Sequence, residues 1–246
     1  MDHEPGAHGQ PNVVLLKDED ATVEVLQRAV GGLWDVVAEL TRLRRSQRSN
    51  YRVTIFGSAR ARPGVYPYDE VKRLAAELTN LGCDIITGGG PGLMQAANEG
   101  AMSAGSGAPG RSTGIRVELP FEQDVNAFVD EVYQHKTFFS RLHQFMIASD
   151  AFVVVPGGIG TLLETCMVWQ LLQVRQLRRT PLILVGAMWE GVIDWARAAM
   201  LRPDVPMANA ADMDIPRCVG SVEETVAIIR QDREEWLVQQ ASAARA

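Results

Sequence analysis

From residue 51 onward, short apolar runs alternate with stretches in which apolar residues recur every three or four positions. The short runs predict β-strands, and the longer periodic stretches predict α-helices. Two runs, Ala151–Val155 and Leu182–Val185, are apolar at nearly every position, as is typical of strands buried on both faces of a parallel sheet. The pattern predicts an α/β protein with a Rossmann-like, doubly wound parallel sheet and helices on both faces.

The predicted elements follow one another in regular alternation. The strands are Arg52–Phe56, Asp84–Thr87, Thr113–Leu119, Val132–His135, Ala151–Val155 and Leu182–Val185, and the helices are Asp69–Leu81, Leu93–Ser103, Phe138–Ala148, Thr161–Gln176, Trp189–Met200 and Val222–Gln239. A loop is predicted from Ala104 to Ser112, where Gly, Ser and Pro are frequent.

The beginning of the chain follows a different pattern. Residues 1–20 are rich in Gly, Pro, His and acidic residues, and we expect them to form a disordered tail. Residues 21–48 are predicted to form an N-terminal helix, because apolar residues between Val23 and Leu40 are spaced three and four apart, although Gly31-Gly32 weakens it. The helix either packs on the main domain or pairs with a second subunit. Residues 49–246 are predicted to form one Rossmann-like nucleotide-binding domain.

Composition and charge exclude several classes of protein. A net charge of −6 argues against non-specific binding to nucleic acid. The three cysteines Cys83, Cys166 and Cys218 are far apart, and the four histidines have no ligand spacing, so we expect no metal site. The sequence has no signal peptide and no apolar run of roughly 20 residues, which a membrane span needs. We expect a cytoplasmic protein without a membrane partner.

Three glycine-rich turns follow predicted strands. They begin at Gly57, at Gly88 and at Pro156. The carboxyl ends of parallel strands lie at one edge of a sheet, so the three turns should converge on one crevice. Four glycines between Gly88 and Gly92 exceed what a tight turn needs, and a helix starting after them favours an anion such as phosphate.

The turns do not match the common nucleotide fingerprints. Leu93 and Leu163 stand where a dinucleotide-binding motif has its third glycine, and the chain contains no GK[ST] sequence. Two glycine turns that share a crevice suit one mononucleotide better than NAD or ATP.

Two charged residues near the third turn are candidates for chemistry. Thr161-x-x-Glu164 has the spacing of a capping box, in which the glutamate serves only the helix end. The same position also directs a carboxylate into the crevice, and the local sequence leaves both readings open. Arg141 is a candidate to clamp phosphate or to pair with Glu164, and a surface arginine is the alternative. His143 faces another side and is interpreted as structural.

The residues 156–164, PGGIGTLLE, resemble the PGGxGTxxE hallmark of the LONELY GUY family, phosphoribohydrolases often mislabelled as lysine decarboxylases. GGGPGLM at 88–94 and FGSAR at 56–60 are similar to the family's first glycine turn and first strand end, and a segment from Leu119 to Asn126 resembles one bacterial branch. The family also carries an Arg-Lys pair before the following strand. Arg141 matches the arginine, whereas Leu142 replaces the lysine.

The resemblance implies hydrolysis of the N-glycosidic bond of a nucleoside 5′-monophosphate, AMP or an N6-modified cytokinin-type analogue. It implies Glu164 as the catalytic carboxylate and Arg141 as its orienting partner, with no cofactor. The implied substrate-binding residues are Gly57, Ser58, Gly89, Gly90, Gly92, Met94, Pro156, Gly157, Gly158, Gly160 and Thr161. A homo-oligomer, a dimer or larger, is also expected.

Two further functions were weighed against this one. A non-catalytic nucleotide or cofactor carrier on the same fold is the alternative, and the missing family lysine at Leu142 leaves it open. A pyridoxal-dependent decarboxylase needs a Schiff-base lysine. The chain has only Lys17, Lys72 and Lys136, none in a recognisable cofactor motif, and we reject that function.

Overall fold

The computed structural model describes residues 20, 22–32, 49–104, 110–117, 125–177 and 180–243. The chain divides into two compact units, residues 1–47 and 48–246. In the first unit residues 22–32 are helical, and Val23, Leu26 and Val30 are exposed. The rest of the predicted N-terminal helix and the predicted tail up to residue 19 lie outside the described residues.

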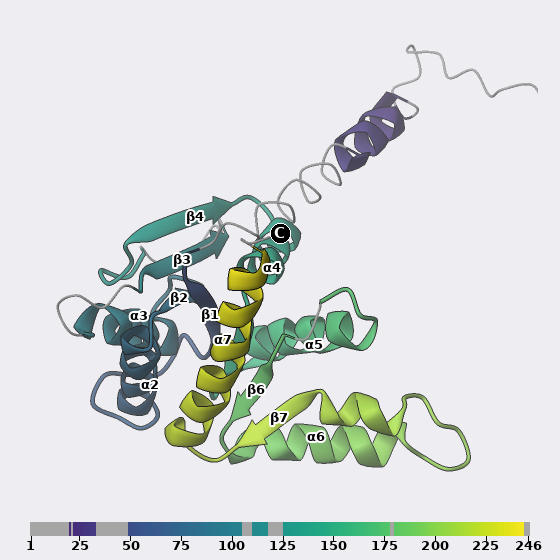
Figure 1. Ribbon diagram of the computed structural model, residues 1–246. Helices are drawn as coiled ribbons and strands as arrows, with labels where there is room; N and C mark the ends of the chain where they lie inside the picture. Colours follow the sequence, from purple (N-terminus) through teal and green to yellow (C-terminus); the bar gives the residue numbers. More distant parts are fainter. Residues whose placement is uncertain are drawn as a thin grey trace, which may run out of the picture. The chain divides into compact units, whose positions relative to one another are not determined.

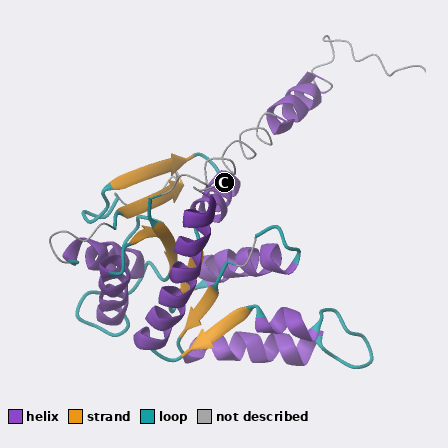
Figure 2. Ribbon diagram, viewed as in Figure 1, coloured by secondary structure: helices purple, strands orange, loops and turns teal. Residues whose placement is uncertain are grey.

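The second unit is built on a seven-stranded sheet in which every neighbouring pair is parallel (Figures 1 and 2). The strands are β1 (Tyr51–Phe56), β2 (Cys83–Thr87), β3 (Ser112–Val117), β4 (Glu131–His135), β5 (Ala151–Val154), β6 (Leu182–Val185) and β7 (Pro216–Val219). Their order is β4-β3-β2-β1-β5-β6-β7. The chain moves outward from β1 in one direction through β4 and in the other from β5 through β7, so the topological switch point lies between β1 and β5.

Helices cover both faces of the sheet (Figure 1). They are α2 (Tyr68–Asn80), α3 (Leu93–Ser103), α4 (Phe138–Ala148), α5 (Ile159–Gln173), α6 (Ala187–Met200) and α7 (Val222–Ala243). Buried side chains of α2, α3 and α7 form one core cluster with strand residues such as Val53, and those of α4, α5 and α6 form a second with residues such as Phe56. The alternation of β1 residues between the two clusters follows from the pleat of the strand. The predicted fold class is confirmed.

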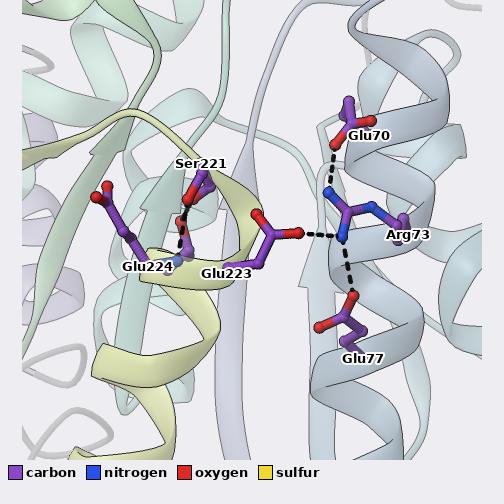
Figure 3. Close-up of polar contacts among 7 residues, drawn as sticks. Glu70, Arg73, Glu77, Ser221, Glu223 and Glu224 are labelled. Carbon is purple, nitrogen blue, oxygen red and sulfur yellow. Dashed lines mark hydrogen bonds and ion pairs between the residues drawn. The ribbon is translucent and has the colours of Figure 1, made fainter.

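One surface arginine links two helices of the first layer. Arg73 on α2 binds Glu70 and Glu77 of its own helix and reaches Glu223 in the first turn of α7 (Figure 3). These groups are largely exposed, so each pair contributes at most about 1 kcal/mol. The network links the first turn of α7 to the middle of α2.

The boundaries differ from the predicted ones in three informative places. Strand β7 and the 3-10 helix η2 (Ala210–Asp214) were not predicted. β7 begins with a proline and contains the exposed Arg217, so this edge strand lacks the apolar run by which the other strands were recognised. Helix α5 begins at Ile159, two residues before its predicted start, and ends at Gln173. It ends early because Arg175, two residues on, has a positive φ of 59°.

Among the described residues, no helix is both long and apolar enough to cross a membrane.

Candidate active site at the switch point

The three glycine-rich turns meet at the carboxyl ends of β2, β1 and β5, three adjacent strands. Backbone hydrogen bonds join them directly. Ser58 N–H donates to Pro156 O at 3.1 Å, and Leu93 N–H donates to Ser58 O at 2.8 Å. The turn after β1 is thus held between the other two, and the predicted convergence on one crevice agrees with this geometry.

Two of the predicted substrate-binding glycines are required by the protein's own packing. A Cβ at Gly57 would lie 2.6 Å from Val155 Cγ2 and 2.9 Å from Leu93 Cβ. Gly92 has a φ of 71°, and a side chain there would overlap the backbone at Ser58. These two glycines allow the first two turns to approach each other, which explains them without a ligand.

The glycines at the start of α5 have a different environment. Gly158 and Gly160 are exposed, and no other described residue comes within 4 Å of the place where a Cβ would stand at either position. Neither has a positive φ. Neither packing nor backbone conformation within the chain therefore requires glycine at these two positions, which leaves room for a bound molecule to approach the helix N-terminus.

The helix start excludes one of the two interpretations of Glu164, the capping box. The N-cap of α5 is Gly158, no side chain caps the helix, and Thr161 is the third helical residue. Thr161 therefore does not occupy the N-cap position that a capping box with Glu164 requires, and that interpretation is wrong. The prediction placed the helix start after the glycines because glycine is a poor helix former, yet α5 already begins at Ile159 and includes Gly160.

Thr161 is 5% exposed and packs against Gly157, where any side chain would overlap its hydroxyl group. Pro156 and Gly157 are partly exposed at the end of β5. In the first turn, the Ser58 hydroxyl accepts a hydrogen bond from Arg60 N–H at 3.1 Å, and its own proton is still available to a ligand.

Arg141 and Glu164 come from helices on the same face of the sheet and lie together beside these turns. Arg141 Nη1 is 3.5 Å from Glu164 Oε1, and both side chains are largely buried. Arg141 Nε donates to Ile115 O on β3 at 2.9 Å, and the guanidinium lies 5.3 Å from the centre of the Phe145 ring. The arginine is therefore fixed at both edges, with one side of its guanidinium directed at the carboxylate.

The environment of Glu164 changes its protonation. Burial raises the pKa of Glu164 from 4.5 to about 7, and the positive charge of Arg141 acts in the opposite direction. Glu164 is also the sole charged residue in the sequence of α5. A carboxyl group with a pKa near neutrality can exchange a proton or stabilise a developing positive charge at physiological pH.

Gly88 and Met94 complete this corner of the site. A side chain at Gly88 would overlap Arg141 Nη2, and its Cβ would lie 2.6 Å from Met94 Sδ. Met94 also covers Gly90, where a Cβ would lie 2.8 Å from the methyl carbon Cε. The second glycine turn is therefore closely approached by both the arginine and the methionine.

Thr87 and Asn98 shape the site and were not among the predicted residues. The Thr87 hydroxyl accepts a hydrogen bond at 2.9 Å from the N–H of Gly89, a residue that was predicted to bind substrate, so this N–H is occupied. The Thr87 hydroxyl in turn donates to Asn98, which is fully buried on α3. A threonine at a strand end and an asparagine inside an apolar helix face were visible in the sequence, but only their partners reveal a role.

Leu142, which stands in the place of the family lysine, is 6% exposed and packs in the core. His143 lies on the same helix, one residue beyond Leu142, and is partly exposed. Within the described part of the chain, no group of three or more His, Cys, Asp or Glu residues has the arrangement of a metal site.

Fold and crevice together define a Rossmann-like α/β protein with glycine turns at its topological switch point, a place where such folds bind nucleotides and related ligands. Residues 94–229, more than half of the chain, match the family model described as possible lysine decarboxylase. The chain belongs to this family.

Solved structures share the fold. The chain is similar to the molybdenum cofactor carrier protein of Chlamydomonas reinhardtii, with a TM-score of 0.56 and 18% identity over 74% of this chain and 98% of that one. It is also similar to the molybdenum cofactor binding protein of the phototrophic bacterium Rippkaea orientalis, with a TM-score of 0.55 and 20% identity over 75% of this chain and 98% of that one. No curated protein matches the sequence.

The family's description names a decarboxylase, and such enzymes commonly use pyridoxal phosphate held by a lysine. The two lysines that the structure describes do not fit this role. Lys72 on α2 forms an ion pair with Glu99 at 2.7 Å, and Lys136 is exposed between β4 and α4. Neither lysine therefore fits the role of a Schiff-base lysine at the glycine turns.

Proposed function

We propose that this chain hydrolyses the N-glycosidic bond of a nucleoside 5′-monophosphate, AMP or an N6-modified cytokinin-type analogue, to the free base and ribose 5-phosphate. The observation that carries the proposal is the buried pair Arg141–Glu164 beside the glycine turns at the switch point. The pair supplies a carboxylate of near-neutral pKa, and the turns supply an anion site within reach of it.

The proposed chemistry uses each part of the site. As the bond between ribose C1′ and the base nitrogen breaks, positive charge develops on the ribose, and ionised Glu164 stabilises it. Glu164 acts either as a base that takes a proton from the attacking water or as a nucleophile that water later displaces. The water oxygen ends on C1′, and a proton ends on the base.

Arg141 is proposed to hold Glu164 in place and to favour its ionised form, since its charge lowers the pKa that burial raises. The N–H groups at the start of α5, with Ser58, Thr161 and the Gly88–Gly92 turn, are proposed to bind the 5′-phosphate. Phosphate binding far from the breaking bond positions the ribose, which is a general way to use binding energy for catalysis.

The test is a panel of nucleoside 5′-monophosphates incubated with the protein, with released base and ribose 5-phosphate measured by chromatography. Wild type is expected to release base from at least one purine nucleotide, and Glu164→Gln is expected to release none while keeping its fold by circular dichroism. Release that persists in Glu164→Gln would assign the activity elsewhere.

A second candidate is a carrier that binds a nucleotide or a phosphate-bearing cofactor without cleaving it. It is favoured by Leu142, a buried apolar residue where the resembled family has a lysine, and by the similar folds of the two molybdenum cofactor proteins. Binding across the panel in calorimetry, with no base released, would favour the carrier over the hydrolase.

We also propose that the chain forms a homo-oligomer. Helix α5 is apolar on nearly all sides, as buried helices are, yet Ile159 is 83% and Leu163 52% exposed. Nearby, Leu162 of α5 and Trp195 of α6 line an apolar groove of about 760 Å³. A second copy is the proposed occupant, and Trp195→Glu is expected to lower the mass measured by light scattering.

A further inference from the structure

A chain of buried hydrogen bonds holds the second glycine turn from within the protein. Thr87 Oγ1 donates to Asn98 Oδ1 at 2.7 Å and accepts from Gly89 N–H at 2.9 Å. Thr87 and Asn98 are both fully buried. The end of β2, the first glycine peptide of the turn and the middle of α3 are thereby joined by one pair of side chains.

Asn126 closes the same network from a separate loop. Its Nδ2 donates to Gly89 O at 3.1 Å, to Gly90 O at 3.0 Å and to Asn98 Oδ1 at 3.0 Å, and its backbone N–H also donates to Gly89 O at 3.0 Å. Its Oδ1 accepts from Phe128 N–H at 3.1 Å. Two consecutive carbonyl groups of the turn are therefore held by one residue.

The other end of the network is anchored in the sheet. Asn98 Nδ2 donates to Ser112 Oγ at 2.8 Å, and that hydroxyl donates to Phe128 O at 2.6 Å. Asparagine is a poor helix former, and a buried one inside α3 has to be compensated by such bonds. Its three partners here come from three different segments, which explains its place in an apolar helix face.

The network determines which way the turn's peptide groups point. In a planar trans peptide the C=O and N–H groups point in opposite directions, and the one cis bond found in the described residues precedes Pro67. With Gly89 O turned towards Asn126, Gly90 N–H points away from it. Pro91 has no N–H, so the second peptide group whose carbonyl faces Asn126 adds no donor on the opposite side, and Gly90 N–H is the donor that these two peptide groups direct away from Asn126.

We infer that Thr87, Asn98 and Asn126 are positioning residues for phosphate recognition: they fix the Gly88–Gly92 turn so that Gly90 N–H is aimed at the ligand. The inference deepens the function proposed above and rests on its phosphate site. Glycine-rich backbone has many accessible conformations, so a turn built from four glycines loses affinity unless something orders it before binding. The buried network supplies that order.

The sharpest test compares two threonines in equivalent settings. Thr87 on β2 and Thr54 on β1 are both fully buried, and each hydroxyl bonds to another side chain, Asn98 for Thr87 and Ser149 for Thr54. Valine has nearly the same shape, so Thr87→Val removes the hydrogen bonds to Asn98 Oδ1 and from Gly89 N–H, and Thr54→Val removes the hydrogen bond to Ser149. Only the first removes a bond to the glycine turn. Asn126→Ala is the second test variant.

Two readouts separate this inference from the proposed hydrolysis. Ribose 5-phosphate binding, measured by calorimetry, reports the phosphate site without requiring turnover. Amide hydrogen exchange of residues 88–92 in the ligand-free protein reports the order of the turn even if no phosphate compound binds. Base release from AMP is measured separately, so a protein that binds but does not hydrolyse still tests the network.

Thr87→Val and Asn126→Ala are expected to exchange the turn amides faster and to raise the Kd for ribose 5-phosphate at least about tenfold. Thr54→Val should also lose thermal stability, while its turn-amide exchange and its Kd for ribose 5-phosphate stay within about twofold of wild type. Unchanged exchange and affinity in the two test variants would overturn the inference, and so would an equal loss in Thr54→Val. If wild type binds no ribose 5-phosphate, the proposed phosphate site is wrong. If in addition the amides of residues 88–92 exchange at the same rate in all variants, the network does not order the turn.

Discussion

The guanidinium of Arg141 lies against the α-carbon of Gly88, where any side chain would overlap its Nη2 atom. The contact joins the helix α4 to the turn after β2, and the same guanidinium faces Glu164 on α5. Three elements separated in sequence thus meet through one arginine, and a glycine is what permits it. This relationship connects the glycine pattern of the turn with the charged pair.

Gly88→Ala should therefore impair Glu164 indirectly, by displacing the arginine that pairs with it. The added methyl group would displace Arg141 or Met94, and overpacking of this kind costs about 1–3 kcal/mol of stability. We expect base release to fall strongly because Arg141 no longer holds Glu164. Urea unfolding and the chromatographic assay measure the two effects. Gly220→Ala is the control, since apart from its chain neighbours no described residue lies within 4 Å of its missing Cβ. Equal activity in both variants would contradict the prediction.

The pH dependence of activity should report Glu164. Burial raises its pKa to about 7, and the proposed mechanism needs the ionised form. Activity is therefore expected to be low at pH 5, to rise through pH 7 and to level off above pH 8. The measurement is kcat/KM for the best nucleotide of the panel across that range. A profile that is flat from pH 5 to pH 8 would exclude the ionised Glu164 as the acting group.

Arg141→Ala should shift this profile as well as lower it. Because the charge of Arg141 lowers the pKa that burial raises, its removal is expected to move the acid limb of the profile to higher pH. An arginine that served only packing would lower activity equally at all pH values. Arg141→Lys keeps the charge but loses the hydrogen bond from Nε to Ile115 O. The acid limb of its pH profile should therefore lie nearer that of wild type than the limb of Arg141→Ala does, at reduced activity.

Stability should depend on pH in the direction opposite to that of activity. Glu164 has a higher pKa in the folded chain than in the unfolded chain, where it is near 4.3. Its contribution is therefore fully present below about pH 4 and is lost as the pH rises through about 7, with a total on the order of 3 kcal/mol. Glu164→Gln removes this dependence. The difference in unfolding free energy between the variant and wild type should grow in favour of the variant from pH 5 to pH 8, and a constant difference would refute the assignment.

The fold could be predicted from the sequence because buried parallel strands and amphipathic helices leave strong periodic patterns. Six of seven strands were recognised, and β7 was missed since its Pro216 and exposed Arg217 give no apolar run. The site was harder. The glycine turns and Glu164 were recognisable locally, whereas the pairing of Arg141 with Glu164 depends on how α4 and α5 pack on the same face of the sheet. Thr87, Asn98 and Asn126 carry no local signal, because their roles consist entirely of partners that folding brings together.

The start of α5 offers the most direct separation of function from folding. Gly160 is the second residue of the helix, it is exposed, and no described residue approaches the position of its missing Cβ. Alanine is the better helix former, so Gly160→Ala should leave stability unchanged or raise it by less than about 1 kcal/mol. If a phosphate lies against this backbone, the added methyl group should nevertheless raise the Kd for ribose 5-phosphate at least about tenfold.

Gly191→Ala on α6 is the matched control for that change, because it too is an exposed helical glycine with no described residue within 4 Å of its missing Cβ. It should show the same or a larger gain in stability with unaltered affinity for ribose 5-phosphate. The space at Gly160 would also be open in a single chain if a second copy packed against α5. Light scattering on both variants therefore tests whether the substitution has changed the assembly. Unaltered affinity in Gly160→Ala would place the phosphate away from the N-terminus of α5. Lost affinity with an unchanged mass would show that the open space at Gly160 is occupied by the ligand and not by a second copy of the chain.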